Sequence, residues 1–220
     1  MLKALLFDFD GLILDTETPE FQIWQSIYRE HGQELPAERW LQIVGGYGMS
    51  DFDAAQHLLQ LTDGGVDPNS LRARHRMESD DLTLAQPVLP GVMDLLDQAR
   101  SASLALAVVS SSPHSWVDLH LSRLKLLDHF SPVICADDVS PGKTKPNPDL
   151  YLKVLEVMGL PADEALAFED SFNGVKAARA AGLFVVAVPN QVTSLLGVDG
   201  ANLTLKSLTE FHLADFLRPR

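Results

Sequence analysis

The chain has 220 residues, which is enough to bury a sizeable core and to form one domain, or one domain with a smaller insertion. Its 17 basic and 30 acidic residues give a formal net charge of -13, which disfavours binding to nucleic acid and to anionic membrane surfaces. The chain has one cysteine, Cys135, which lies in an apolar run, so no disulfide can form within the chain. It shows no signal-peptide pattern and no long uncharged apolar run. These features together predict a cytoplasmic protein without membrane spans.

The first apolar stretch, Lys3 to Phe9, is predicted to be a buried strand. Its period of two places Asp8 and Asp10 on one side of the strand, with the phenylalanines between them on the other. Two carboxylates that share a small site repel each other unless a proton or a cation is held between them, so this pair is costly for a purely structural strand end. Gly11 allows the chain to turn sharply behind the pair.

The stretch from Thr18 to about Leu84 is predicted to be helical, without a convincing strand. Thr18 and Pro19 form an N-cap and first-turn pair for its first helix. The expected helices cover residues 18–31, 37–44, about 50–61, and a segment that follows the turn at residues 63–68. A flexible glycine-rich loop, Gly45 to Met49, separates the second helix from the third. This block is predicted to be a helical insertion.

From Pro87 onward, helices alternate with short apolar strands. The expected strands are Leu104 to Val109, Val133 to Ala136, Leu166 to Phe168 and Phe184 to Val188. This alternation implies a doubly wound parallel sheet with helices on both faces, in which the first stretch of the chain is a fifth strand. Leu203 to Leu205 is a candidate edge strand, and Leu208 to Leu217 is expected to form a final helix. The predicted class is therefore α/β.

Polar residues follow the ends of several predicted strands. They are Asp8 and Asp10, Ser110 to Ser112, Asp137 and Asp138 with Lys143 and Lys145 beyond them, and Glu169 with Asp170. Because parallel strands present the same end to one crevice, these groups are expected to converge on a single pocket. The carboxylates are hard oxygen donors suited to Mg²⁺, and Ser110 with a lysine can hold a phosphate oxygen. We therefore expect a cation site beside an oxyanion site.

Four motifs occur in a characteristic order. They are Asp8-Phe9-Asp10-Gly11 followed by Asp15-Thr16-Glu17, then Ser110, then Lys145 in Lys-Pro-Asn-Pro-Asp, and finally Glu169-Asp170-Ser171-Phe172-Asn173-Gly174. Together they resemble the motifs of the haloacid dehalogenase superfamily, in the branch that contains β-phosphoglucomutase and small sugar-phosphate phosphatases. The resemblance covers essentially the whole chain. It implies a Rossmann-like core over residues 1–16 and 87–220, and an inserted all-helical cap domain over residues 17–86.

The resemblance also implies the roles of the carboxylates. Asp8 would attack phosphorus and become a phosphoaspartate, and Asp10 would act as general acid and then as general base. Mg²⁺ would be held by Asp8, the main-chain carbonyl of Asp10 and Asp170, with Glu169 as a further ligand or as a neighbour of the ligands. Ser110 and Lys145 would bind the phosphoryl oxygens. The full set of expected substrate and phosphate contacts is Ser110, Ser111, Lys145, Asn173, Tyr47 and Glu20.

We therefore expect a Mg²⁺-dependent phosphohydrolase that acts on a small phosphate monoester, with a sugar phosphate as the first choice. The expected partner is this small molecule alone, without nucleic acid or membrane, and the expected state is a monomer, with a dimer as the alternative. A β-phosphoglucomutase-type phosphomutase would use the same core residues. Mutase-type caps, however, usually carry a histidine and an arginine where this chain has Glu20 and Met49.

Other classes fit less well. A dehalogenase or phosphonatase would need a different group in place of Asp10, and a receiver-type phosphoacceptor places its acidic pair before the acceptor strand. A serine hydrolase would need a Gly-x-Ser-x-Gly elbow, which the chain lacks, and its seven histidines show no metal-ligand spacing. Arg72 and Arg76, four apart on an expected helix, could clamp a second anionic group, although a solvated charged face is the simpler interpretation.

Overall fold

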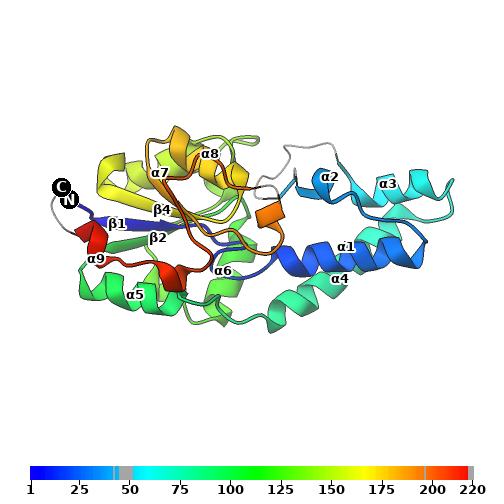
Figure 1. The fold of residues 1–220 in the computed structure, drawn as a ribbon, viewed down its shortest axis with the longest axis horizontal. Coiled ribbons are helices and arrows are strands. Elements are labelled where there is room, and N and C mark those ends of the chain that lie inside the picture. The colour runs from blue at the N-terminus through cyan, green and yellow to red at the C-terminus, as the bar shows by residue number, and fades with distance from the viewer. Residues whose placement is uncertain (42, 45–51, 196, 218–220) are drawn as a thin grey trace.

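A parallel β-sheet forms the centre of the computed structural model, which describes residues 1–41, 43–44, 52–195 and 197–217 (Figure 1). Within these residues the sheet has six strands in the order β3-β2-β1-β4-β5-β6. The strands are β1 (Ala4–Phe7), β2 (Ala105–Val109), β3 (Val133–Ile134), β4 (Ala165–Glu169), β5 (Phe184–Ala187) and β6 (Leu203–Thr204). The predicted doubly wound parallel sheet and its edge strand are confirmed.

Helices connect the strands along the chain. They are α1 (Glu17–Glu30), α2 (Ala37–Leu41), α3 (Ala54–Leu61), α4 (Pro68–Ala85), α5 (Val92–Ser101), α6 (His114–Arg123), α7 (Asp149–Met158), α8 (Phe172–Ala180) and α9 (Ala214–Leu217). Short 3-10 helices occur at Leu127–His129, Ala136–Asp138, Ala162–Glu164, Thr193–Leu195 and Leu208–Glu210. Helices α7 and α8 lie on one side of the sheet, and α5 and α6 lie on the other (Figure 1).

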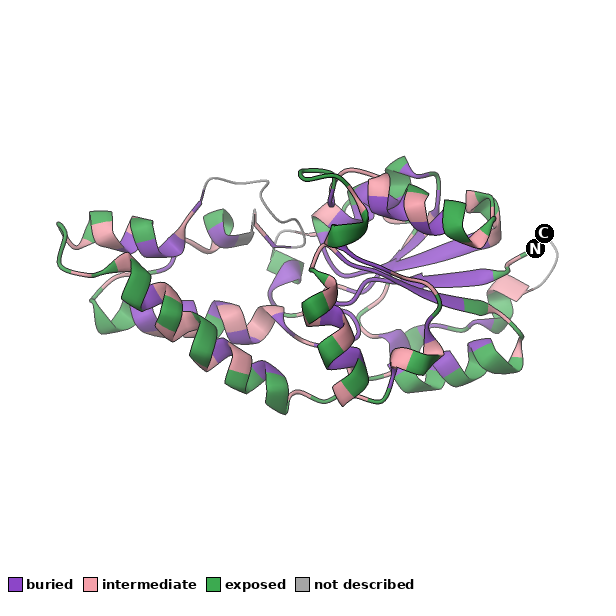
Figure 2. Cartoon of the chain, turned by 180° about the vertical axis from the view of Figure 1, so that it is seen from behind, coloured by how far each residue is buried: buried purple, intermediate pink, exposed green. Residues whose placement is uncertain are grey.

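The alternation of side chains along β1 explains why the sheet needs helices on both faces. Leu5 and Phe7 belong to the hydrophobic cluster that α5 and α6 complete, whereas Ala4 and Leu6 belong to the cluster that α7 and α8 complete. All four residues of β1 are fully buried, because β2 and β4 flank the strand within the sheet and helices cover both of its faces. Strands buried on both faces are apolar throughout, which is why this one is visible in the sequence as an uninterrupted run. Figure 2 shows the buried strands enclosed by helices whose outer faces are exposed.

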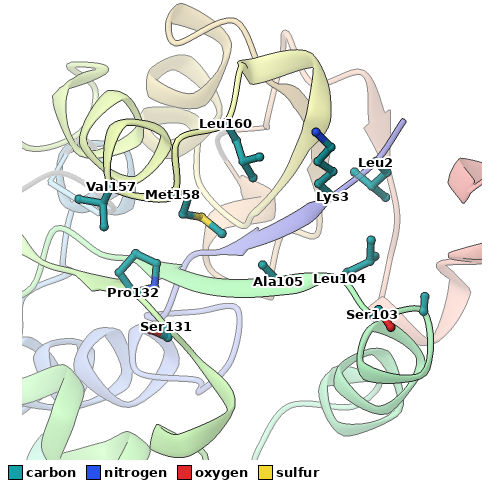
Figure 3. A pocket seen from close by; sticks show the side chains of 11 residues that line it. Leu2, Lys3, Ser103, Leu104, Ala105, Ser131, Pro132, Val157, Met158 and Leu160 are labelled. Atoms are coloured by element: carbon teal, nitrogen blue, oxygen red, sulfur yellow. The ribbon is translucent and has the colours of Figure 1, made fainter.

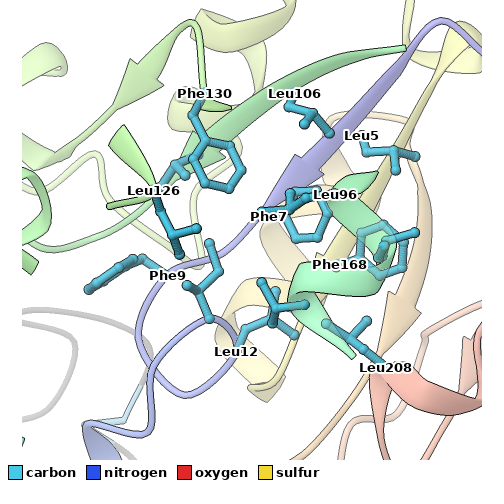
Figure 4. Packing of buried hydrophobic residues seen from close by; sticks show 14 of the residues in the cluster. Leu5, Phe7, Phe9, Leu12, Leu96, Leu106, Leu126, Phe130, Phe168 and Leu208 are labelled. Carbon is cyan, nitrogen blue, oxygen red and sulfur yellow. The ribbon is translucent and has the colours of Figure 1, made fainter. Parts of the chain in front are cut away.

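Aromatic rings fill the cluster on the α5 and α6 side of the sheet (Figure 4). The Phe7 ring stacks on Phe168 with centroids 4.9 Å apart, and the edge of the Phe130 ring approaches Phe7 at 5.8 Å. Phe168 also meets Phe211 edge-on at 4.9 Å. Burying each of these side chains contributes about 1.5–3 kcal/mol, so this packing fixes the direction of β1 and of the residues that follow it.

The helical region, made of α1 to α4, lies beyond the end of the sheet to which the strands point (Figure 1). It has a hydrophobic cluster of its own, to which Trp24, Tyr28, Trp40 and Leu58 belong. Helix α1 begins at Glu17 and α4 ends at Ala85, close to the proposed domain boundaries. The division into a core and a cap domain stays a prediction. In the part of the chain that the structure describes, no helix combines the length and the apolar character that a membrane crossing needs.

Three helix boundaries differ from the predictions. Helix α1 begins at Glu17, one residue earlier than expected, with Thr16 instead of Thr18 as its N-cap. The carboxylate of Asp15 accepts a hydrogen bond from the main-chain N–H of Thr18 at 3.0 Å, so Thr18 lies inside the first turn. The second helix, α2, ends at Leu41 instead of residue 44. Helix α3 begins at Ala54, where the side chain of Asp53 accepts hydrogen bonds from the main-chain N–H groups of Ala55 and Gln56.

The final helix expected over residues 208–217 is wrong. The chain forms a 3-10 turn at Leu208–Glu210 and a short helix, α9, at Ala214–Leu217. Phe211 and Leu213 are both buried against the sheet, and side chains two residues apart point in nearly opposite directions from a continuous helix. An extended segment between the two short helices lets both side chains reach the core.

An open cavity of about 560 Å³, with apolar and polar lining residues, lies at the amino ends of β1 and β2 (Figure 3). Leu2, Leu104, Pro132, Met158 and Leu160 are among the residues that line it. The polar residues that follow the strands lie at the opposite, carboxyl ends. The functional site is therefore built at the other edge of the sheet from this cavity.

The fold predicts a strong effect of a side chain at Gly91. Gly91 has a φ of +87°, and a Cβ atom there would lie 2.5 Å from the main-chain nitrogen of Thr209. Gly142 has a similar φ of +78°, but a Cβ atom would meet nothing within 4 Å. We expect Gly142→Ala to lower the free energy of unfolding by about 1 kcal/mol through backbone strain alone, and Gly91→Ala to lower it by about 3 kcal/mol. Denaturant unfolding of both variants measures the difference, and equal losses would contradict this packing.

Candidate active site

The carboxyl ends of the central strands bring five polar side chains into the interior. Asp8 directly follows β1, Ser110 follows β2, and Glu169 and Asp170 lie at the end of β4. Lys145 reaches the same place from the loop before α7. None of the five is more than 5% exposed. Buried ionisable groups are costly unless they are paired, so their interactions indicate what the site does.

Lys145 is the cation of this group. Its Nζ lies 2.5 Å from Asp8 Oδ1 and 2.7 Å from Glu169 Oε1. The hydroxyl of Tyr151 also donates a hydrogen bond to Glu169 Oε1. Burial alone would lower the pKa of Lys145, but the charges of Asp8 and Glu169 outweigh burial and raise it. The lysine is therefore charged, and it offsets part of the negative charge around it.

The carboxylates of Asp8, Glu169 and Asp170 each offer an oxygen, and these oxygens lie within 4.8 Å of one another. One lysine cannot neutralise three carboxylates. Burial, opposed by Lys145 and assisted by the Glu169 charge, raises the pKa of Asp8 to about 8. Burial, together with the charge of Asp8, raises the pKa of Asp170 well above its usual range. The group therefore holds excess negative charge that a bound cation would stabilise.

The donor set fits Mg²⁺. Glu169 Oε2 is buried and has no hydrogen-bond partner, so an oxygen with unsatisfied acceptor capacity is already present in the cluster. Asp170 Oδ2 accepts a hydrogen bond from Asn190 Nδ2 at 2.9 Å, which fixes the orientation of that carboxylate. Oxygen ligands from a few carboxylates are the donors that Mg²⁺ prefers. The predicted metal residues Asp8, Glu169 and Asp170 are thus brought together.

Two glycines make room for the carboxylates. Gly11 has a φ of +80°, and a Cβ atom there would lie 2.2 Å from Asp170 Oδ2. The sharp turn predicted at Gly11 is confirmed. A Cβ atom at Gly174, in the first turn of α8, would lie 1.8 Å from Glu169 Oε2. Both glycines therefore lie in direct contact with the acidic cluster.

Asp10 lies in a separate hydrogen-bond network. Its Oδ1 accepts a hydrogen bond from Trp116 Nε1 at 2.8 Å. Its Oδ2 accepts one from Ser112 Oγ at 2.6 Å and a longer one from Ser110 Oγ at 3.2 Å. The donors come from the end of β2 and the first turn of α6, so the side chain of Asp10 is turned away from Lys145 and toward α6.

The remaining predicted contacts have different surroundings. Ser111 Oγ is buried without a hydrogen-bond partner beside Ser110, so it is available to a ligand. Asn173 Nδ2 instead donates to the main-chain carbonyl of Val44 at 3.0 Å, which ties α8 to the helical region. Tyr47 lies outside the described residues. Glu20 is half-buried on α1.

The first turn of α1 adds carboxyl groups to the site. Burial raises the pKa of Glu20 to about 7, with further contributions from the charges of Asp10 and Asp80. Burial and the charges of Glu20 and Asp10 likewise raise the pKa of Glu17. The helical region therefore presents carboxyl groups to the edge of the site where Asp10 lies.

Trp116 and Asn190 are site residues that the sequence analysis missed. Asn190 lies three residues after β5, so the rule that polar residues after a strand belong to the site would have found it. Trp116 gives no comparable signal, because a tryptophan in an amphipathic helix normally indicates core packing. Only the geometry of α6 shows that its indole N–H reaches Asp10.

Comparison with known proteins agrees with this geometry. Residues 5–188 match the family described as haloacid dehalogenase-like hydrolase. The chain is 40% identical to "Putative phosphatase YhcW" of Bacillus subtilis (strain 168), over 97% of this chain and 96% of that protein. It is 31% identical to fructose-1-phosphate phosphatase YqaB of Escherichia coli (strain K12), over 84% of this chain and 95% of that protein.

A solved structure shares the architecture. It is a HAD family hydrolase from Deinococcus radiodurans R1, crystallised with bound phosphate and sodium. The TM-score is 0.74 at 26% sequence identity, and the match covers 97% of this chain and 94% of the other. The resemblance predicted from the four motifs is confirmed, and this chain belongs to the haloacid dehalogenase-like hydrolase family.

Proposed function

We propose that the protein is a Mg²⁺-dependent phosphohydrolase that cleaves a small phosphate monoester, a sugar phosphate in the first place, through a phosphoaspartate on Asp8. The observation that carries the proposal is the buried group of Asp8, Glu169 and Asp170 around Lys145, which has more negative charge than the lysine can offset. The named phosphatase relatives support a phosphatase activity, and the fructose-1-phosphate phosphatase supports a sugar phosphate. The bound phosphate and cation of the Deinococcus structure support the ligand chemistry.

In the first step, a carboxylate oxygen of Asp8 attacks phosphorus, and the bond between phosphorus and the leaving oxygen breaks. The leaving oxygen takes a proton from the Asp10 carboxyl group and departs as an alcohol. Lys145 stays beside Asp8 and offsets the charge of the transferred phosphoryl group. The free hydroxyl of Ser111 and that of Ser110 are placed to donate to its oxygens.

In the second step, a water molecule attacks the phosphoaspartate and gives one proton to the Asp10 carboxylate. The bond between phosphorus and the Asp8 oxygen breaks, so the Asp8 carboxylate returns and inorganic phosphate leaves. Asp8, Asp170 and the main-chain carbonyl of Asp10 would hold Mg²⁺, which would offset the repulsion between the anionic nucleophile and the anionic phosphate. Glu169, with its unpartnered Oε2, is the further candidate ligand.

A phosphomutase would use the same core residues and return the phosphoryl group to a sugar. That reaction needs a cation that grips the far phosphate of a bisphosphate intermediate. Among the described residues of the helical region, the arginines that could do so are engaged elsewhere or exposed. Arg72 pairs with Asp53 at 2.5 Å, Arg74 pairs with Glu30 and Glu78, and Arg76 is exposed.

Glu20 strengthens the case for hydrolysis. It stands where a mutase-type cap would usually have a histidine, and it presents a carboxyl group near Asp10 and Asp80. An acidic group at this position repels a second phosphate and tolerates a neutral polyol. Met49, the other position that distinguishes mutases, lies outside the described residues. Water is therefore the expected acceptor of the phosphoryl group.

Asp8→Asn tests the nucleophile. Because an amide cannot form the phosphoaspartate, we expect phosphate release from a sugar phosphate to fall by at least about 1,000-fold. The exposed Asp199→Asn is a matched control that should keep full activity. Phosphate release measured with and without EDTA tests the metal requirement in the same assay. If the turnover of Asp8→Asn were within tenfold of that of the wild type, Asp8 could not be the nucleophile.

The raised carboxyl pKa values predict a metal effect on stability that depends on pH. A carboxyl whose pKa is raised in the folded protein stabilises it below the usual carboxyl range, and this stability is lost as the pH rises toward about 8 for Asp8. Mg²⁺ should restore it. We expect Mg²⁺ to raise the Tm more at pH 8 than at pH 5. At a hundredfold excess of Mg²⁺ over its Kd, binding raises the free energy of unfolding by up to about 2.7 kcal/mol.

The control for the metal effect is Asp170→Asn, which removes one candidate ligand without changing the size of the side chain. Its Mg²⁺-induced Tm shift at pH 8 should be smaller than that of the wild type. Equal shifts at both pH values in the wild type, or an unchanged shift in Asp170→Asn, would place the cation elsewhere.

A substrate panel separates hydrolase from mutase. We expect hexose phosphates and other small monoesters to release phosphate, and β-glucose 1-phosphate not to be converted efficiently to glucose 6-phosphate. Because Glu20 repels a second phosphate, Glu20→Gln should raise kcat/KM for a hexose bisphosphate relative to a hexose monophosphate. Chromatography of the sugar products and a phosphate assay give both rates. Isomer conversion that outpaces phosphate release and is stimulated by glucose bisphosphate would make the protein a phosphomutase.

A further inference from the structure

The two oxygens of the Asp10 carboxylate have different partners. Oδ1 accepts the indole N–H of Trp116 at 2.8 Å, whereas Oδ2 lies between the hydroxyls of Ser112 and Ser110 at 2.6 and 3.2 Å. Among the described residues, Trp116 is the nitrogen donor that contacts this carboxylate. Lys145 interacts with Asp8 and Glu169 instead.

An indole N–H can only donate a hydrogen bond, whereas a serine hydroxyl can donate or accept. While the bond from Trp116 is kept, a proton on Oδ1 would face the indole hydrogen, so Oδ1 is restricted to the role of acceptor. Oδ2 can carry or lack a proton, because the hydroxyls beside it can rotate to match either state. The indole therefore distinguishes two oxygens that are chemically equivalent in a free carboxyl group.

The indole is held in place by its neighbours. Its ring meets His120, one turn further along α6, edge-on with centroids 4.3 Å apart. His120 is itself buried and lies against the ring of Phe9, which immediately precedes Asp10 in the chain. The N–H direction is thus fixed by packing between α6 and the end of β1.

We propose that Trp116 is a positioning residue that fixes the Asp10 carboxyl group and reserves Oδ2 as the oxygen that exchanges protons with the substrate. The inference rests on the proposed function, in which Asp10 protonates the leaving oxygen. Ser110, one of the proposed phosphate contacts, lies beside Oδ2 and not beside Oδ1. The oxygen that the indole leaves free is therefore the one on the phosphate side.

Removal of the indole N–H should matter only where Asp10 transfers a proton. Without that bond, the carboxyl group can rotate about its terminal bond, and a smaller share of the molecules presents a protonated oxygen to the leaving group. A sugar alkoxide needs this proton to leave, whereas a nitrophenolate does not. Because kcat/KM reports the steps up to phosphoryl transfer, it excludes the later hydrolysis of the phosphoaspartate, in which Asp10 acts with every substrate.

The experiment compares kcat/KM for a sugar phosphate and for p-nitrophenyl phosphate in three variants. We expect Trp116→Phe to lower the ratio of the two values by about tenfold, a part of the 10²–10⁴ that a general acid contributes. Asp10→Asn should lower the ratio further. Trp40→Phe is the control, because the Trp40 indole is buried and its N–H has no hydrogen-bond partner, and it should leave the ratio unchanged.

If Trp116→Phe folds poorly, the indole can be replaced at position 116 by the isosteric benzothiophene side chain, which keeps the bicyclic shape and lacks the N–H. A ratio that stays at the wild-type value in this protein or in Trp116→Phe, while Asp10→Asn lowers it, would overturn the inference and leave the proposed function intact. An equal fall in Trp40→Phe would overturn it as well, since the effect would then be general. If Asp10→Asn leaves the ratio unchanged, Asp10 is not the general acid, and the proposed function itself loses that step.

Discussion

The structure depends on holding three carboxylates and one lysine together at the buried end of a parallel sheet. Asp8, Glu169 and Asp170 come from two adjacent strands, and Lys145 comes from a loop far along the chain. Ionised groups in the interior cost several kcal/mol each unless they are paired. The aromatic packing beside β1 and the glycines beside the carboxylates fix where these charges lie, and a bound cation would stabilise the excess negative charge.

Much of this arrangement could be predicted because it follows from local patterns. The period of two in β1 and the rule that polar residues gather at the carboxyl ends of parallel strands are both visible in the sequence. The clustering of Asp8, Asp170 and Lys145 follows from them. The roles of these residues came from the family resemblance and remain proposals.

What could not be predicted depends on tertiary orientation. The split of the expected final helix arises because Phe211 and Leu213 are both drawn to one face of the sheet, and a single-segment pattern does not show that face. Asn173 lies in a recognisable motif and was expected to contact the substrate, yet its amide donates a hydrogen bond to the main-chain carbonyl of Val44 in the helical region. Trp116 is a packing residue by pattern, and its hydrogen bond to Asp10 depends on tertiary structure, which brings the first turn of α6 beside Asp10.

Two aspartates that are two residues apart thus occupy different environments. Period-two alternation would place Asp8 and Asp10 side by side, but β1 ends at Phe7 and the turn at Gly11 follows at once. Asp8 therefore stays in the buried charge cluster, whereas Asp10 turns to neutral donors on α6 and in the segment between β2 and α6. A nucleophile needs a nearby cation to approach a phosphate, and a proton carrier needs partners that tolerate both of its protonation states. The end of a single strand meets both requirements, because the elements on its two sides supply different partners.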